Sequence, residues 1–413
     1  MVDKLVIVLV IILGALAIAQ IMRVSELAQK LSKYKPEETP PSENNFNAIS
    51  MIVFMVLLHA FLIYLIVDYG FIDLGPAASV GGQQIDFIYS IQWVLVLLVY
   101  FSCVTLTFWF SYKYRKKPGV KAIFYPYNNK LEMIWTVVPA AGLSVMVILG
   151  LKTWNDITSP ATEDYENVEV FAYQFAWTAR YSGMNNELGK FDYKLTTPEN
   201  PYAIVTRDNI ERSLELMKVG EPGSEGIEML EAKLNDNSSV ISKSERKKLM
   251  TELGRKERMA RLLEAMSVTY NDSLDELALD DVIVEDSLVL LKGQKYNFSF
   301  RSKDVIHSAY FPHFRAQMNT VPGLTTYFKI QPVYTSDEMK EILDNPEFEY
   351  AILCNKVCGT AHYRMKMSVK VLGPKEYLEW QKTKSTIDGT PWIEGNESQL
   401  LEYYEAIASR IDN

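Results

Sequence analysis

The stretch that decides the fold and chemistry of this chain is Cys354-Asn355-Lys356-Val357-Cys358-Gly359-Thr360-Ala361-His362-Tyr363-Arg364-Met365. It holds two thiols, an imidazole and a thioether, and a second imidazole, His307, lies upstream. Thiolate and thioether ligands select Cu(I), and imidazole binds either oxidation state of copper. Because a Cys-x3-Cys loop is tight enough for both sulfurs to bridge two metal ions, the stretch predicts a dinuclear copper centre.

Two other interpretations fit part of this stretch. A structural zinc site also uses Cys and His, and Cys354 and Cys358 could form a disulfide in an oxidising compartment. Neither interpretation uses Met365. Met365 also begins an alternation of apolar and polar residues, and in a strand of that kind it would be a core residue.

The complete pattern, Cys-x3-Cys-x3-His-x2-Met with an upstream Asp-Val-Ile-His-Ser, resembles the binuclear copper A site of cytochrome c oxidase subunit II. The resemblance implies bridging thiolates at Cys354 and Cys358, terminal imidazoles at His307 and His362, and a weak thioether ligand at Met365. It also implies a backbone carbonyl ligand at Lys356. Relatives usually have Glu at that position, where the side chain helps to hold magnesium or manganese, and Lys356 cannot do so.

Four apolar runs occupy the first third of the chain, and each is near the ~20 residues needed to cross a hydrocarbon core of ~30 Å. They are Leu5 to Met22, Ile49 to Val67, Phe87 to Phe110 and Met133 to Leu151. We therefore expect four membrane-spanning helices.

The loops predict the orientation of these helices, because cytoplasmic loops collect Lys and Arg. The segment after the first run is basic, residues 68–86 contain no Lys or Arg, and the segment after the third run is basic again. The basic residues after the first run are Arg23, Lys30, Lys33 and Lys35. Those after the third run are Lys113, Arg115, Lys116, Lys117, Lys121 and Lys130. Both termini and the metal-binding half are therefore expected on the periplasmic side of a bacterial cytoplasmic membrane. Ala17-Ile18-Ala19 is typical of a signal-peptide cleavage site, but losing one span would reverse every loop charge, so we favour retention.

The segment Asn129 to Pro139 resembles the start of the second transmembrane helix of subunit II. The third and fourth helices are thus expected to be the family's membrane hairpin, and the first two an addition. The expected division is 1-86 for the additional pair, 87-155 for the hairpin, 156-205 with 280-381 for the copper domain, 206-279 for an insertion and 382-413 for a tail.

Residues with high β-propensity dominate Tyr165 to Ser182. Further strand candidates are Ile283 to Leu291, Tyr296 to Arg301, Thr326 to Val333 and Tyr363 to Leu372. They predict a β-sandwich or Greek-key barrel, and the resemblance implies a cupredoxin. The expected fold is therefore membrane α-helical hairpins followed by an all-β cupredoxin-like Greek-key domain with a helical insertion.

Residues 206–279 are charged and helical in character. Ser242-Lys243-Ser244-Glu245 is a capping-box pattern, and apolar residues follow it at roughly helical spacing. The family pattern has no such insertion. It is either a solvated decoration or a docking surface for another subunit.

Two further positions bear on electron and proton transfer. Tyr173 to Trp177 matches the family's aromatic stretch over the copper centre, but Phe175 stands where relatives usually have the Trp that receives electrons from cytochrome c. Trp177 is retained, and a core aromatic explains it well. Glu132 matches a family Glu at the mouth of a proton pathway, although a helix start also favours Glu.

Composition excludes several classes of function. The net charge of −9 argues against nucleic acid and favours a basic protein partner. No Cys-x2-Cys-His motif occurs, so no c-type haem is expected on this chain.

These observations lead to one functional prediction. The chain is expected to be subunit II of a respiratory haem-copper cytochrome c oxidase, whose copper A centre accepts electrons from cytochrome c, or from a cytochrome bound in a complex or supercomplex. Haem in subunit I would receive these electrons and reduce O2, with proton translocation. Expected partners are subunit I, the other oxidase subunits and membrane lipid. The alternatives are a copper A subunit of a nitric oxide reductase and a non-catalytic, zinc-stabilised membrane anchor.

Overall fold

The computed structural model of the chain describes residues 2–30, 40–70, 74–162, 164–221, 223–236, 241–393 and 395–412. The chain divides into two compact units. One contains residues 1–73 and 90–145, and the other contains residues 74–89 and 146–413.

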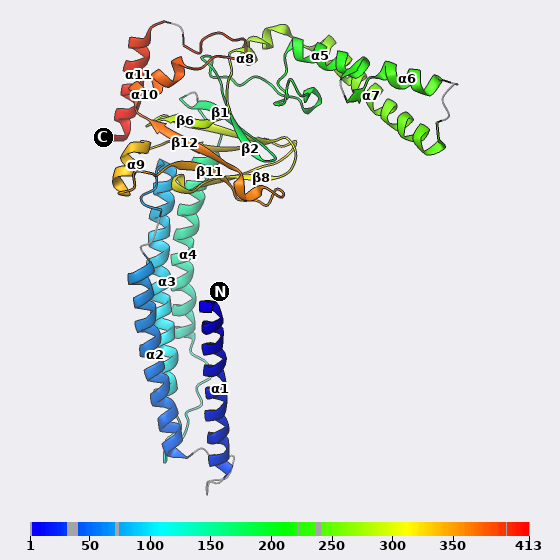
Figure 1. Cartoon of the computed structure of the whole chain (residues 1–413). Coiled ribbons are helices and arrows are strands. Elements are labelled where there is room, and N and C mark those ends of the chain that lie inside the picture. The colour runs from blue at the N-terminus through cyan, green and yellow to red at the C-terminus, as the bar shows by residue number, and fades with distance from the viewer. Residues whose placement is uncertain are drawn as a thin grey trace. The chain divides into compact units, whose positions relative to one another are not determined.

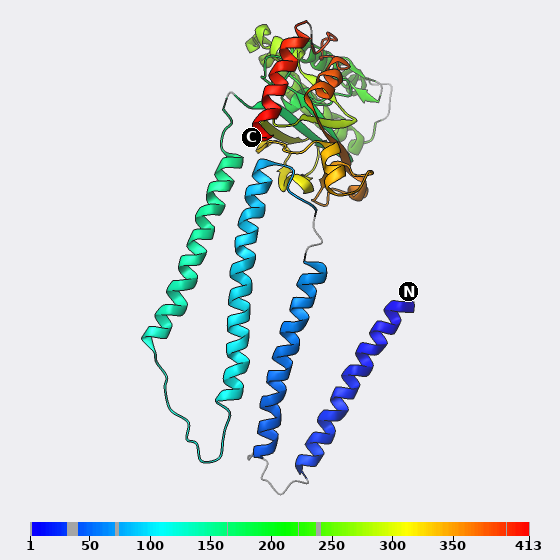
Figure 2. The same cartoon turned by 90° about the vertical axis from the view of Figure 1, so that its left-hand side faces the viewer.

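Long helices fill the N-terminal third: α1 (Val2–Lys30), α2 (Pro41–Tyr69), α3 (Val80–Lys113) and α4 (Asn129–Thr158) (Figure 1). Among the described residues, α2, α3 and α4 are long and apolar enough to cross a membrane. Residues 114–128, between α3 and α4, contain no helix or strand (Figure 2). Three of the four expected spans are therefore present as helices of the required length and composition.

The first expected span coincides with the helix α1. Half of the side chains of its apolar run lie outside the described residues, as do the expected loop residues Lys33 and Lys35 and the side chain of Lys30. A fourth membrane-spanning helix therefore stays a prediction.

Two five-stranded sheets form the β-rich part of the second unit, as expected. Their strand orders are β10-β7-β1-β2-β5 and β6-β12-β11-β8-β9. The strands are β1 (Glu166–Tyr173), β2 (Ala176–Tyr181), β5 (Val282–Val284), β6 (Ser287–Leu291), β7 (Tyr296–Ser302), β8 (His307–Phe311), β9 (Ala316–Thr320), β10 (Thr326–Ile330), β11 (Tyr350–Cys354) and β12 (Lys366–Leu372).

The alternating pattern of these strands puts most of their apolar side chains in one core, while Val289 and Leu291 of β6 lie in a second cluster. Phe298, Phe300 and Phe311 lie in contact in the first core, together with Trp177. The prediction of a strand from Tyr363 to Leu372 was wrong at its N-terminal end, because His362–Arg364 form a 3-10 turn and β12 begins only at Lys366.

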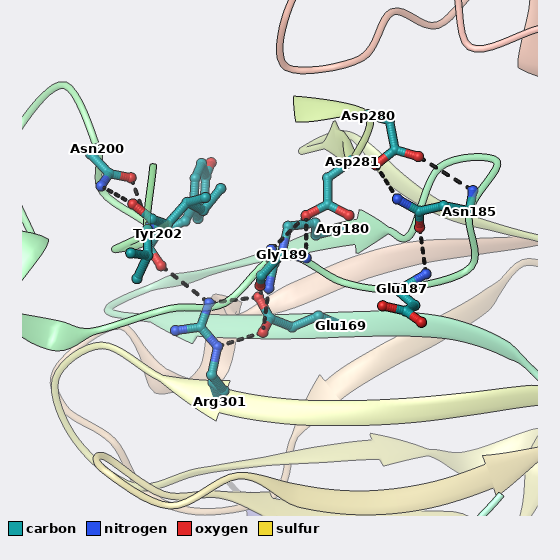
Figure 3. Close-up of polar contacts among 12 residues, drawn as sticks. Glu169, Arg180, Asn185, Glu187, Gly189, Asn200, Tyr202, Asp280, Asp281 and Arg301 are labelled. Carbon is teal, nitrogen blue, oxygen red and sulfur yellow. Dashed lines mark hydrogen bonds and ion pairs between the residues drawn. The ribbon is translucent and has the colours of Figure 1, made fainter. Parts of the chain in front are cut away.

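A buried ion cluster ties three strands to neighbouring loops (Figure 3). Arg180 of β2 binds Glu169 of β1 at 3.1 Å and Asp281 at 2.7 Å, while Arg301 of β7 binds Glu169 at 2.7 Å. The two guanidinium groups also donate to the backbone oxygens of Gly189 and Tyr202. The four charged side chains are at most 5% exposed, so each charge depends on the others.

The insertion contains α5 (Arg207–Lys218), α6 (Ile227–Asn235), α7 (Lys243–Thr269) and α8 (Glu276–Leu279), with a two-stranded ribbon of β3 (Gly220–Glu221) and β4 (Ser224–Glu225). Ser242 caps α7 by accepting a hydrogen bond from the N–H of Glu245, as the capping-box pattern predicts for that half of the motif. Ile210 and Leu263 of the insertion form a separate core with Leu195 and Val205, which precede the insertion in the chain.

Three more helices complete the second unit: α9 (Ser336–Ile342), α10 (Pro374–Lys382) and α11 (Glu397–Asp412). Residues 74–89 are held against the β-strands by backbone hydrogen bonds from Ala78 to His313 and from Val333 to Ala78. Arg315 adds an ion pair with Asp86 at 3.0 Å.

Candidate metal centre

Neighbouring strands bring the proposed ligands together. His307 begins β8, Cys354 ends β11, and these two strands are paired so that Cys354 lies opposite Ala309. The loop from β11 to β12 then carries Cys358, His362 and Met365. The residues that the sequence grouped by spacing therefore lie at one end of one sheet.

The two sulfur atoms are the centre of the group. Cys354 Sγ lies 3.8 Å from Cys358 Sγ, 4.0 Å from His307 Nδ1 and 3.2 Å from the carbonyl oxygen of Lys356. Cys358 Sγ lies 3.6 Å from His362 Nδ1 and 3.8 Å from Met365 Sδ. Each thiol thus faces one imidazole and one further donor, and His307, Cys354 and Cys358 form a group that could hold a metal ion.

Most of these donors are shielded from solvent. His307 is 0%, Met365 2% and Cys358 5% exposed. Burial raises the pKa of the Cys358 thiol to about 11, and its contact with Cys354 acts in the same direction. A metal that binds here must displace that proton, because the thiolate is the ligand.

Two residues that sequence reasoning did not assign to the site hold its loops. Asp304 accepts a hydrogen bond from His307 Nε2 at 2.9 Å, and Gln174 Nε2 donates to the carbonyl oxygen of Cys358 at 2.5 Å. The backbone N–H of Gln174 also donates to Asp304 at 2.7 Å. Burial raises the pKa of Asp304, but hydrogen bonds from His307, Gln174 and Val305 outweigh it and hold the pKa below its usual value. The only sequence signal was an acidic residue three positions before a ligating His.

Two aromatic residues, Trp177 and Phe175, lie beside the candidate metal ligands, one of them buried and the other partly exposed. Trp177 is buried in the core, with its ring centroid 6.1 Å from that of His307. Phe175 is partly exposed, and a Cβ atom on Gly359 would lie only 2.9 Å from its ring. Phe175 therefore packs directly on the ligand loop.

Glu132 is not part of this group. It lies in the first turn of α4, in the other unit, and its Oε1 accepts a hydrogen bond from the N–H of Asn128 at 3.4 Å. Asn128 in turn caps the N–H groups of Lys130 and Leu131. This carboxylate therefore has a local bond at the helix start.

The chain is similar in sequence to several known proteins. An alternative cytochrome c oxidase subunit 2 of Bradyrhizobium diazoefficiens is 25% identical over 344 residues, which are 83% of this chain and 94% of that protein. The resemblance to cytochrome c oxidase subunit II is confirmed. The subunit 2 of Corynebacterium glutamicum is 22% identical over 79% of this chain and 77% of its own length.

Other comparisons add less. No family model matches the chain. The periplasmic domain of subunit II of the cytochrome oxidase of Bradyrhizobium japonicum covers 54% of this chain and 92% of its own, at 13% identity and a TM-score of 0.25.

Proposed function

We propose that the chain is the electron-accepting subunit II of a haem-copper cytochrome c oxidase. Cys354, Cys358, His307, His362, Met365 and the Lys356 carbonyl would hold two copper ions. Such a centre supplies one-electron transfer with little change in its ligands. The single observation that carries the proposal is the mutual arrangement of the two thiols, each of which faces an imidazole and a further donor.

The residues around the thiols keep this arrangement fixed and dry. Asp304 orients the ring of His307, and Gln174 fixes the loop through the Cys358 carbonyl. Trp177 closes the core side of the site, and Phe175 covers the loop at Gly359. A rigid, shielded site needs little rearrangement when one electron arrives or leaves, which favours rapid transfer.

Met365 distinguishes this proposal from a zinc-stabilised anchor. A closed zinc site takes four ligands from Cys and His and gains nothing from a thioether. Here Met365 Sδ lies 3.8 Å from Cys358 Sγ and is buried with it. The thioether thus lies where a soft metal would use it.

The spectrum of the purified, copper-loaded chain tests the proposal. Two copper ions bridged by two thiolates should give a purple protein with one unpaired electron shared over both nuclei in the EPR spectrum. Cys354→Ser should abolish that spectrum, whereas Lys356→Ala should leave it nearly unchanged, because only the backbone carbonyl faces the site. A colourless protein holding one zinc ion would overturn the proposal.

As a further part of the proposal, the insertion would bind an electron donor or a partner subunit within the complex. Its helix α7 carries eight Lys or Arg and four Glu residues, and Met250 on that helix is 59% exposed. In the deletion variant a short Gly-Ser linker replaces residues 208–269, and Tyr270, next to the deletion, keeps its contact with the Val205 carbonyl at 3.2 Å. The deletion should release the partner from the purified complex and retain the copper spectrum. An unchanged subunit composition and turnover would show that the insertion is a decoration.

A further inference from the structure

Three loops meet at the metal centre, and together they form one end of the β-rich part. The N–H of Gln174 in the β1–β2 loop binds Asp304 in the β7–β8 loop. The Gln174 side chain binds Cys358 in the β11–β12 loop. Side chains that leave these loops toward solvent therefore share a surface, which is where a donor protein comes nearest to the thiols.

The exposed side chains of these loops include cationic and large apolar ones, besides the acidic Asp304 and the neutral polar residues Gln174, Asn355 and Thr360. We name this surface the metal-loop face and define it by Lys303, Ile306, Lys356, Val357, Tyr363 and Arg364, all of which are exposed. Val357 is 83% and Tyr363 75% exposed, and the Arg364 guanidinium lies over the Tyr363 ring at 5.3 Å. Large apolar side chains at such exposure are typical of a contact surface.

The cations of this face are not neutralised by any carboxylate among the described residues. Within the described part of the chain, no carboxylate lies within ion-pair distance of Lys303, Lys356 or Arg364. Asp304 is the acidic residue of these loops, and its carboxylate accepts hydrogen bonds from His307 and from the N–H groups of Gln174 and Val305. Three basic side chains and one acidic side chain leave the loops with a charge of +2.

This local charge is opposite to that of the whole chain, which is −9. The overall charge favoured a basic partner. Exposed charges more than about 10 Å apart are largely screened at physiological salt, so a partner that docks here responds to the nearest groups. The charge of the metal-loop face therefore decides whether the docking surface of the partner is acidic or basic.

We propose that the electron donor docks on the metal-loop face through an acidic surface around a small apolar centre. The inference rests on the proposed function and adds the chemistry of the partner. One electron leaves the donor and is accepted at the metal centre, and no atom or proton is exchanged. Complementary charge raises the rate of such encounters by 10- to 1,000-fold at low salt.

Stopped-flow reduction of the purified oxidase complex tests this inference. The probes are a reduced acidic c-type cytochrome and a reduced basic one, at ionic strengths from roughly 10 mM to 300 mM. We expect the acidic cytochrome to react faster at low salt and its rate constant to fall ~10-fold or more as salt rises. Lys303→Glu with Arg364→Glu should remove that advantage and favour the basic cytochrome.

Lys375→Glu with Arg410→Glu is the matched control, because both residues are exposed on α10 and α11 and the charge change is the same. It should leave both rate constants near the wild-type values. If Arg364→Glu disturbs the copper spectrum, Lys303→Glu alone should still give part of the loss. A faster reaction with the basic cytochrome, or rates that ignore the charge reversal, would overturn the inference.

Reduction of the purified complex by a small uncharged hydroquinone distinguishes a wrong docking inference from a wrong proposed function. If the hydroquinone reduces the copper centre while the charge pattern fails, only the docking inference is wrong. If neither the hydroquinone nor a cytochrome reduces any centre on this chain, the proposed function is wrong as well.

Discussion

Asp304 accepts a hydrogen bond from His307 Nε2 at 2.9 Å, while Nδ1 of the same ring faces Cys354 Sγ at 4.0 Å. A neutral imidazole has one donor and one acceptor nitrogen, so this bond fixes the tautomer that leaves the Nδ1 lone pair free. Asp304 is itself held by two backbone N–H groups. The proposed ligand His307 is thus oriented before a metal binds.

Replacing Asp304 should therefore weaken metal binding. Loss of a carboxylate that orients a ligating His typically costs 10- to 100-fold in metal affinity, and we expect Asp304→Ala to fall in that range. Asp304→Asn keeps an oxygen acceptor and should lose less. Competition with a copper chelator measures the affinities. The exposed Asp286→Ala is the control, and equal affinity of Asp304→Ala and this control would contradict the assigned role.

Gly359→Ala should distort the ligand loop. Gly359 has a φ of +144°, and an added Cβ would lie 2.9 Å from the Phe175 ring and from Gln174 Nε2. We expect a loss of about 1–3 kcal/mol in stability together with reduced copper content, measured by thermal unfolding and metal analysis. Gly254→Ala is the control, because nothing lies within 4 Å of its Cβ position and α7 should gain about 0.5–1 kcal/mol. Equal behaviour of the two variants would contradict this prediction.

Removing Glu169 should destabilise the β-rich part strongly. Glu169→Ala leaves Arg180 and Arg301 buried without their shared partner, and such a change typically costs about 3–5 kcal/mol. Glu199→Ala, which breaks an exposed pair with Arg212, should cost far less, because water solvates both charged groups. Thermal unfolding of both variants at pH 7 measures the difference. A similar small effect of both would show that the buried cluster relaxes without Glu169.

Protonation of the Glu169 carboxylate should determine how the stability of the β-rich part falls in acid. Burial raises the pKa of this carboxyl, but the two guanidinium groups outweigh burial and lower it to about 2 from 4.5. Because the folded pKa lies below the ordinary value, the stabilisation is complete above pH 4.5 and is lost as the pH falls toward 2. The melting temperature of the wild type should decline through this window, and that of Glu169→Gln should decline less.

Glu166 should have the opposite pH dependence. Its partial burial raises its pKa to about 7 from 4.5, and the hydroxyl of Tyr377 only partly offsets this. Because the folded pKa is raised, its stabilisation is present below pH 4.5 and is lost as the pH rises through 7. Glu166→Gln, which cannot ionise, should therefore gain stability over the wild type between pH 5 and 8. Parallel melting curves over that range would contradict the assignment.

The sequence predicted those features that depend on local spacing. Cys354, Cys358, His362 and Met365 lie in one loop, so their spacing alone grouped them, and alternating apolar residues revealed strands such as β7. Strand β9 was not predicted, because Gln317 and Asn319 alternate with small or weakly apolar residues and give no strong pattern. Pairing with β8 on one side is what makes this segment a strand.

The contacts that orient the ligands could not be predicted in the same way. Gln174 and Asp304 are 130 residues apart, and Gln174 and Cys358 are 184 residues apart. Only the fold brings them into contact. The charge of the metal-loop face was hidden for a related reason, because the whole-chain sum of −9 includes many distant acidic residues.

The last prediction concerns Glu132, which the sequence placed at the mouth of a proton pathway. A carboxylate on the cytoplasmic side can take protons from water, and positioned proton transfer typically contributes ~100-fold or more to the step that it serves. Glu132→Gln removes the titratable group but keeps an oxygen that can accept from the Asn128 N–H. Steady-state oxygen uptake by the complex should slow, while the copper spectrum and the rate of copper reduction stay unchanged.

Asn128→Ala provides the contrast that decides between the two roles of Glu132. It removes the side-chain cap of α4 at Lys130 and Leu131, at a cost of about 0.5–2 kcal/mol, and leaves the carboxylate in place. If Glu132 serves proton transfer, oxygen uptake should suffer in Glu132→Gln and remain near the wild-type rate in Asn128→Ala. If Glu132 serves only the helix start, Glu132→Gln should retain full activity across the pH range, because its amide oxygen can accept the same hydrogen bond.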